Sequence, residues 1–145
     1  MTHAAPSPSA LYATADAPLR VVDSITELGP HDAGCVAVSG SHGGLSSARY
    51  ALAARPLLSI FNDAGVGLRD AGIAALDFLQ QHNLAACTVA HHSACIGQAH
   101  STWQEGTVAH TNAAASALGI APGMPCHAVV HRLCGVRPDA PPPAA

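Results

Sequence analysis

The stretch AGCVAVSGSHGGLSS, residues 33–47, decides the predicted fold. Its segment Cys35–Ser39 is continuously apolar up to the final serine, which predicts a strand buried on both faces. The glycine-rich turn Gly40–Gly44 follows, and Ser46 or Ser47 can cap a helix that begins there. A strand that runs directly into a glycine turn and a helix is typical of α/β proteins.

Two later segments repeat this plan. The apolar run Leu57–Phe61 ends in FNDAGVG (61–67), and the run 85–90 ends in HHSACIG (91–97). An amphipathic pattern predicts a helix over 68–82 between them. Strands and helices that alternate with short connections predict parallel strands with helical crossovers. The predicted fold is therefore a small three-layer α/β domain with a short, mainly parallel sheet of three or four strands.

The rest of the chain adds fewer elements. Leu19–Val22 is predicted as an edge strand, and 97–118 as helical with an interruption at Gly106. Pro125 and Gly135 bracket a last helix, Cys126–Cys134.

Proline, alanine and serine dominate both ends of the chain. We expect flexible tails at 1–18 and 138–145 and a single α/β domain over 19–137.

The composition of the chain indicates which kinds of molecule the protein can bind. Charged residues make up 10% of the chain and apolar residues 49%, so little charge is available to cover a free monomer. We therefore expect a homo-oligomer or a partner subunit. The net charge of −3 with six Lys and Arg argues against nucleic acid. No apolar run approaches the ~20 residues of a membrane span, and no secretory signal is evident.

Cysteine usage bears on the cellular compartment. The five cysteines are odd in number and contain no Cys-x-x-Cys pair. This usage favours a reducing, cytoplasmic setting.

The three polar loops follow three predicted parallel strands, and ligands of such sheets bind beyond the carboxyl ends of the strands. In the first loop, Gly40, Ser41, Gly43 and Gly44 are predicted to bind an anionic oxygen, because glycine amides and a helix start favour negative charge. His42 is predicted to move protons. The alternative is a tight turn that needs glycine only for its backbone.

In the second loop, Asp63 directly follows a strand and can act as a general base or orient a histidine. Asn62 beside it is a predicted substrate contact. The alternative for Asp63 is a turn-forming side chain bonded to its own backbone. The run Gly65–Gly67 is only a fragment of a dinucleotide-binding fingerprint.

In the third loop, His91 is the predicted partner in proton transfer, and His92 and Ser93 are predicted substrate contacts. A packed Cys95 is the preferred interpretation, and a nucleophile near a helix start is the alternative. Ser93 can also be a helix cap. His110, on the apolar stripe of the helix predicted over 97–118, is interpreted as a packed core residue.

Histidine and carboxylate side chains also bind metals. His42, Asp63, His91 and His92 are candidate zinc ligands, although no His-x-His or His-x-x-x-His pair occurs among these loops. The preferred prediction uses neither a metal nor a bound organic cofactor.

One local resemblance stands beside this interpretation. The residues AVSGSHG (37–43), with Ser46 or Ser47 and then PLL (56–58), resemble the nucleotide-loop segment of universal stress proteins. In that family the segment lies near the C-terminus and its backbone holds phosphates. The resemblance covers some twenty residues and implies nucleotide binding.

Three functions are open at this point. The first is a small α/β enzyme subunit, a hydrolase, lyase or isomerase, acting on a small anionic or carbonyl-containing metabolite. The second is a non-catalytic nucleotide or small-molecule binding protein, and the third is a structural subunit of a larger complex.

Overall fold

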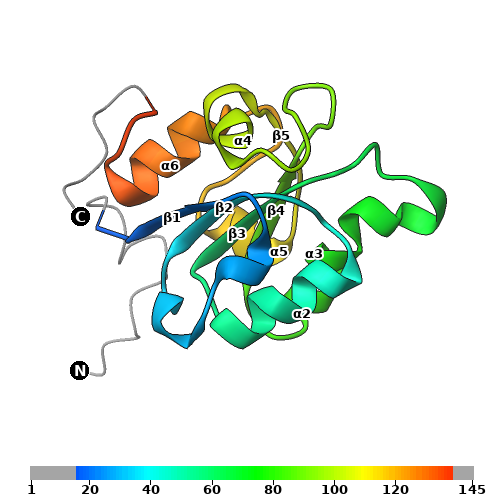
Figure 1. Ribbon diagram of the computed structural model, residues 1–145, viewed down its shortest axis with the longest axis horizontal. Coiled ribbons are helices and arrows are strands. Elements are labelled where there is room, and N and C mark those ends of the chain that lie inside the picture. Colours follow the sequence, from blue (N-terminus) through cyan, green and yellow to red (C-terminus); the bar gives the residue numbers. More distant parts are fainter. Residues whose placement is uncertain (1–15, 139–145) are drawn as a thin grey trace.

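The computed structural model describes residues 16–138 and contains a five-stranded, mainly parallel sheet with helices on both faces (Figure 1). The strands lie side by side in chain order; the first four are parallel, and the fifth is antiparallel to the fourth. They are β1 (Leu19–Val22), β2 (Val36–His42), β3 (Leu58–Asn62), β4 (Ala85–Val89) and β5 (Val108–Thr111).

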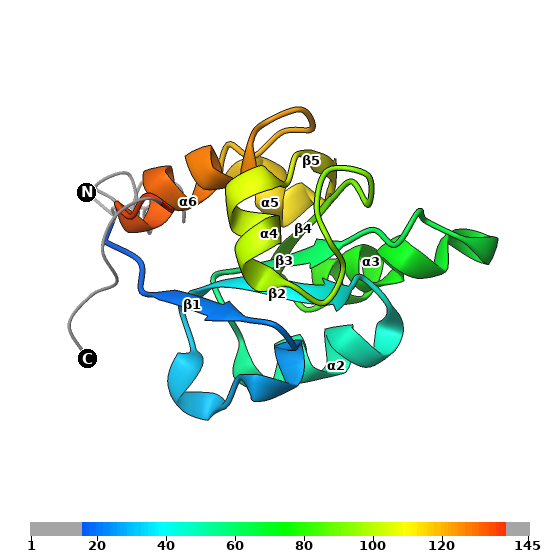
Figure 2. The ribbon, with the colours of Figure 1, turned by 45° about the horizontal axis from the view of Figure 1, so that its top comes forward.

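The helices form two layers, one on each side of the sheet (Figure 2). The 3-10 helices η1 and η2 contact α2, and α2 contacts α3, so the crossovers between parallel strands share one face. On the opposite face α4 packs against α6. The helices are η1 (Ile25–Glu27), η2 (Pro30–Asp32), α2 (Leu45–Ala54), η3 (Leu68–Ile73), α3 (Ala74–Gln80), α4 (Ala99–Glu105), α5 (Ala113–Ala117) and α6 (Cys126–Cys134).

Burial on both faces explains why the central strands are continuously apolar. Every residue of β3 and β4 is buried, and neighbouring side chains enter different clusters. Ile60 belongs to the cluster that includes residues of α4 and α6, whereas Phe61 belongs to the cluster with residues of α2 and α3. Alternate residues of a strand point to opposite faces, so a sheet covered on both sides needs apolar side chains at nearly every position.

The predicted fold class is confirmed, with five strands in place of three or four. The bounds of the edge strand β1 and of the last helix α6 agree with the prediction. Gly135 ends α6 in the left-handed conformation, with φ 73°, as its place after the helix predicts.

The prediction of helical structure from Gly97 to Leu118, interrupted at Gly106, agrees with α4 and α5 but is wrong for the segment between them. The helix α4 ends at Gly106, and Val108–Thr111 forms β5, which pairs with β4. This segment contains β-branched residues, which favour strands, and β4 offers an edge whose backbone groups need partners. Tertiary pairing therefore outweighs the helical spacing.

The helix predicted over 68–82 is shorter than expected. Its first part is the 3-10 helix η3, in which Arg69 and Asp70 have φ of 56° and 58°; the regular helix α3 covers Ala74–Gln80. Close packing accounts for the irregular start, because a Cβ on Gly72 would overlap the carbonyl oxygen of Asp63. Asn83, predicted as a left-handed residue after this helix, has φ 59°.

Residue 17, which lies within the predicted tail 1–18, packs against the domain. Ala17 is buried, and its N–H donates to the carbonyl of Leu133 in α6. The remaining parts of the predicted tails, 1–15 and 139–145, lie outside the described residues. Among residues 16–138 no helix is long and apolar enough to cross a membrane.

Candidate functional site

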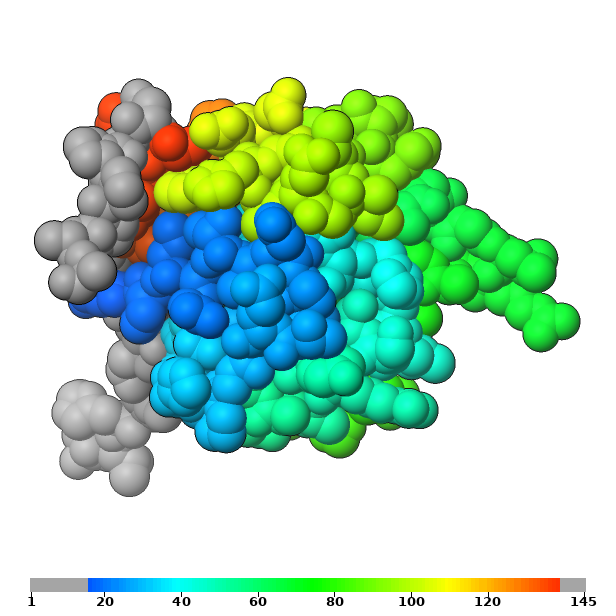
Figure 3. Space-filling model, viewed as in Figure 1, coloured from blue at the N-terminus to red at the C-terminus, as the bar shows by residue number. Residues whose placement is uncertain are grey.

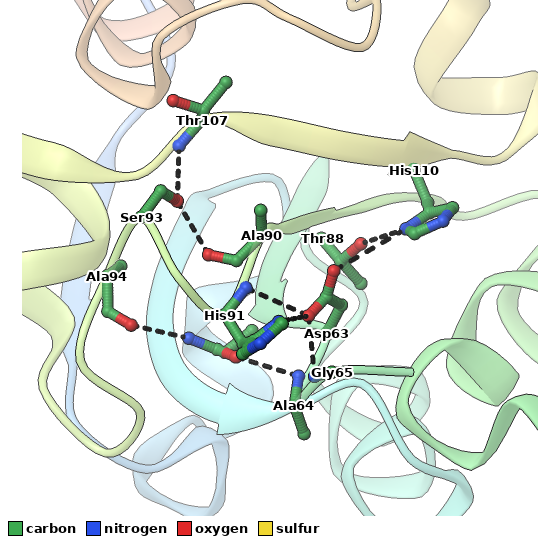
Figure 4. A network of polar contacts seen from close by, with 11 residues as sticks. Asp63, Ala64, Gly65, Thr88, Ala90, His91, Ser93, Ala94, Thr107 and His110 are labelled. Carbon is green, nitrogen blue, oxygen red and sulfur yellow. Dashed lines mark hydrogen bonds and ion pairs between the residues drawn. The ribbon is translucent and has the colours of Figure 1, made fainter. Parts of the chain in front are cut away.

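A buried carboxylate stands at the carboxyl end of the central strand β3. The side chain of Asp63 is 6% exposed. Its Oδ1 accepts hydrogen bonds from the N–H groups of Gly65 (2.8 Å) and His91 (3.0 Å) (Figure 4). Two backbone donors fix the orientation of this carboxylate and compensate for its removal from water.

Two histidines from different segments flank this carboxylate. His91, in the loop after β4, places Nδ1 3.4 Å from Oδ1 of Asp63. His110, on β5, places Nδ1 4.0 Å from Oδ2 and 3.3 Å from Oγ1 of Thr88. Figure 4 shows the two imidazole rings on either side of the carboxylate. A carboxylate in this position can set the tautomer of an imidazole and stabilise its protonated form.

Each histidine borders a different cavity. His91 lines a cavity of about 510 Å³ together with Asn62, His92, Ser93, Cys95 and Glu105. His110 lines a second cavity of about 400 Å³ with Arg69 and Asp70. We call them the His91 cavity and the His110 cavity. Because each histidine is partly exposed, at 56% and 38%, both rings combine contact with Asp63 and access to solvent.

The segment after Asp63 has an unusual backbone. Four of its non-glycine residues have positive φ, among them Ala64 at 52° and the β-branched Val66 at 67°. Such conformations are costly for residues with a Cβ, and most of all for a β-branched one. Strained backbone of this kind is characteristic of functional sites.

The hydrogen bonds of this segment converge on the end of β3. Asn62 Oδ1 accepts from Ala64 N–H at 2.8 Å, and the carbonyl of Asp63 accepts from Val66 N–H at 2.7 Å. The N–H of Gly72 donates to the carbonyl of Val66, which closes the loop. The strained loop is thus held by the residues that form the site.

Two predicted substrate contacts brace the site with their polar atoms. Both polar atoms of the Asn62 amide are hydrogen-bonded: Oδ1 accepts from the N–H of Ala64, and Nδ2 donates to the carbonyl of Ala94 at 3.2 Å. The hydroxyl of Ser93 donates to the carbonyl of Ala90 and accepts from the N–H of Thr107. These side chains shape the His91 cavity, and His92 lines it beside them.

The glycines of the first loop allow close backbone packing. The N–H of Gly40 donates to the carbonyl of Asp23, and that of Gly43 to the carbonyl of Asn62. Both amides are therefore occupied by protein carbonyls. A Cβ on Gly40 would overlap the backbone of Gly97. Absence of a side chain is what these two positions require.

The other residues of the first loop line neither of the two cavities beside Asp63. Gly40–His42 is the end of strand β2, and Ser41 Oγ accepts from the N–H of Ile25 at 2.9 Å. Gly44 is the residue that precedes the first turn of α2. His42 lines neither the His91 cavity nor the His110 cavity. His91 contacts Asp63, whereas His42 pairs with Asn62 in the sheet and lines neither cavity.

The cysteines divide into one exposed and four buried thiols, all of them free. Burial raises the pKa of Cys35 to about 11 and the pKa values of Cys126 and Cys134 to about 12, and it also raises the pKa of Cys87. These four thiols stay protonated at neutral pH and are poor nucleophiles. Cys95, for which the sequence favours a packed position, is exposed and lines the His91 cavity.

His110 is not among the predicted site residues, because the helix predicted over 97–118 includes it. The segment TVAHT (107–111) follows a glycine and has β-branched residues at its first, second and last positions. Such a pattern favours a strand over a helix. A strand there would have brought His110 to the end of the sheet.

Within the described range 16–138, no group of three or more His, Cys, Asp or Glu residues is arranged to hold a metal ion.

Comparisons of the chain with models of protein families, with curated proteins and with solved structures found no match.

Proposed function

We propose that the protein is a small α/β enzyme that acts on a small anionic or carbonyl-containing metabolite in the His91 cavity. The observation that carries this proposal is the contact between the buried carboxylate of Asp63 and the partly exposed imidazole of His91, 3.4 Å apart at the edge of the His91 cavity. A carboxylate–imidazole pair at the carboxyl ends of parallel strands is suited to general acid–base chemistry.

In this proposal His91 is the group that exchanges a proton with the substrate. Its Nδ1 faces Asp63, so Nε2 is the ring nitrogen left for a ligand. As Nε2 takes up a proton, the Asp63 carboxylate stabilises the resulting imidazolium. Hydrolysis, elimination and isomerisation all need such a step, and the mixed polar and apolar lining of the cavity suits a small molecule.

The first test is a search for turnover with the wild-type protein and two variants. We expect the wild type to convert a member of a panel of small carboxylic acids, keto acids and esters, followed by proton NMR. His91→Gln should reduce this turnover by about 10²–10⁴-fold, because the general base is lost. His127→Gln, on the exposed part of α6, is the matched control and should behave as wild type.

The same samples distinguish the binding alternative. A protein that only binds nucleotides would show a thermal shift with ATP or AMP and no turnover of any panel member. That result would reject the enzymatic proposal and favour a non-catalytic nucleotide or small-molecule binding protein.

We further propose that the chain associates with a second copy of itself through the loop that follows β3. This loop projects from the body of the molecule (Figure 3). Leu68 on it is 83% exposed, and Arg69 and Asp70 follow directly. In a twofold dimer, an apolar residue followed by one positive and one negative charge complements itself, since Arg69 of one copy can face Asp70 of the other.

The dimer is tested by light scattering after size-exclusion chromatography. We expect Leu68→Lys to yield a monomer, whereas Leu45→Lys, at an exposed leucine of α2, should leave the dimer intact. Arg69→Asp and Asp70→Arg should each weaken the dimer, and the double variant should restore it. A wild-type protein that elutes as a 14.5 kDa monomer would reject this assembly and also weaken the idea of a structural subunit.

A further inference from the structure

The His91 cavity has a carboxylate on its wall that the proposed proton transfer does not use. Glu105, the last residue of α4, lines this cavity together with His91, His92 and Ser101. Among the described residues that line the cavity, none is Lys or Arg, and Glu105 is the only acid. A ligand there meets two imidazole rings from the loop after β4 and one negative charge from α4.

A chain of hydrogen bonds holds the carboxylate of Glu105 in place. The hydroxyl of Ser101, one turn earlier in α4, donates to Oε1 of Glu105 at 2.9 Å. The same hydroxyl accepts from the N–H of Cys95 at 2.8 Å. Ser101 is only 7% exposed, so its hydroxyl is a fixed donor in the cavity wall. Because Glu105 is already held, it loses less conformational freedom on binding a ligand than a free side chain would.

No protein cation neutralises the charge of Glu105. Asp32 and Asp63 each have a basic or imidazole partner, whereas Glu105 makes no ion pair with any residue in the described part of the chain. Its position at the C-terminal end of α4 adds to the negative potential, because the carbonyl groups of a helix end carry partial negative charge. Oε1 is engaged by Ser101, which leaves Oε2 for a ligand.

A fixed and unpaired carboxylate favours one class of ligand. A protonated amine is attracted to it and donates charge-assisted hydrogen bonds to its oxygens, whereas the carboxylate of a free acid is repelled. The imidazole of His91 lines the same cavity and is suited to a group that exchanges protons, such as a carbonyl compound during its reaction. Ala94 and Ile96 in the lining offer apolar contacts to the carbon atoms between the two groups.

We propose that the His91 cavity binds a small amino-carbonyl compound, such as the amide or ester of an amino acid. Its ammonium group binds Glu105, and its carbonyl group lies at His91. This inference rests on the proposed function, from which it selects the carbonyl compounds that also carry a protonated amine. Glu105 determines specificity, Ser101 positions Glu105, and the Asp63–His91 pair remains the group that moves the proton.

The test measures binding of three small probes by the backbone amide signals in NMR, and it requires no turnover. Glycinamide carries both an amine and a carbonyl, acetamide lacks the amine, and acetate is an anion. At neutral pH we expect the wild type to bind glycinamide about tenfold more tightly than acetamide, and acetate most weakly. The signals of Glu105, Cys95 and His91 should shift. The advantage of glycinamide should decrease as the salt concentration rises, because salt screens the pair of charges.

Two variants of Glu105 and one control assign the effect to its charge. Glu105→Gln keeps an oxygen for the hydroxyl of Ser101, so glycinamide should bind about tenfold more weakly and acetamide as before. Glu105→Lys should reverse the preference, so that acetate binds more tightly than glycinamide. Glu27→Gln is the matched control, because Glu27 is the only other glutamate of the chain and also accepts a hydrogen bond, from the N–H of Ser24. It lies outside the lining of the His91 cavity and should bind all three probes as wild type.

The outcomes separate this inference from the proposed function. Equal binding of glycinamide and acetamide by the wild type, absence of glycinamide binding, or full binding in Glu105→Gln would overturn the inference. Turnover that is lost in His91→Gln would support the proposed function even then. Glycinamide binding that depends on Glu105, without turnover of any tested compound, would support the recognition of an amine and reject the enzymatic proposal.

Discussion

Replacing Asp63 with asparagine is expected to reduce turnover by about 10³-fold while leaving the fold intact. Asparagine keeps an oxygen that accepts from the N–H groups of Gly65 and His91, so we expect a loss of stability of only about 1 kcal/mol. The negative charge opposite the two imidazole rings is removed. The rate falls because an imidazolium formed during the reaction is no longer stabilised.

The matched control is Asp32→Asn, which also removes a buried carboxylate. Asp32 pairs with Arg20 at 3.2 Å and accepts from the N–H of Gly29, and it lies before β2, at the opposite end of the strands from Asp63. Its substitution should lower stability and leave turnover unchanged. The double variant Asp63→Asn/His91→Gln should be about as slow as the slower single variant, because the two residues act as one unit. Unchanged turnover in Asp63→Asn would remove Asp63 from the mechanism.

Replacing Asn112 with alanine is expected to destabilise the protein by about 3 kcal/mol. The side chain is buried and makes four hydrogen bonds to the backbone. Its Oδ1 accepts from the N–H groups of Ala86 and Ala115, and its Nδ2 donates to the carbonyls of Leu76 and Leu84. Asn112 therefore caps α5 and ties it to α3 and β4. Alanine would remove the cap and leave buried backbone groups without partners.

Chemical denaturation at neutral pH measures this effect. The neighbouring Thr111, whose hydroxyl bonds only to the exposed Ser116, provides the control; Thr111→Ala should cost less than about 1 kcal/mol. Asn112→Asp should also be strongly destabilising, because it retains the acceptor oxygen but presents a carboxylate to two carbonyl groups. A loss below 1 kcal/mol in Asn112→Ala would show that the surrounding backbone finds other partners.

The sequence by itself determined the parallel sheet. Strands β2, β3 and β4, with helices between them, can be predicted from apolar runs that end in glycine and polar residues. Amphipathic segments separate these runs. The reason is local: a strand covered on both faces needs apolar residues throughout, and that requirement is visible in the order of residues. The same pattern placed Asp63 and His91 at the carboxyl ends of neighbouring strands.

The tertiary structure alone decided which polar groups meet. His110 reaches Asp63 because TVAHT pairs with the open edge of β4, although its spacing also suits a helix. The backbone of Gly40 packs against that of Gly97, although the two residues lie more than fifty positions apart in the sequence. Contacts across the sheet and the burial of single atoms depend on distant segments, so no local pattern in the sequence encodes them.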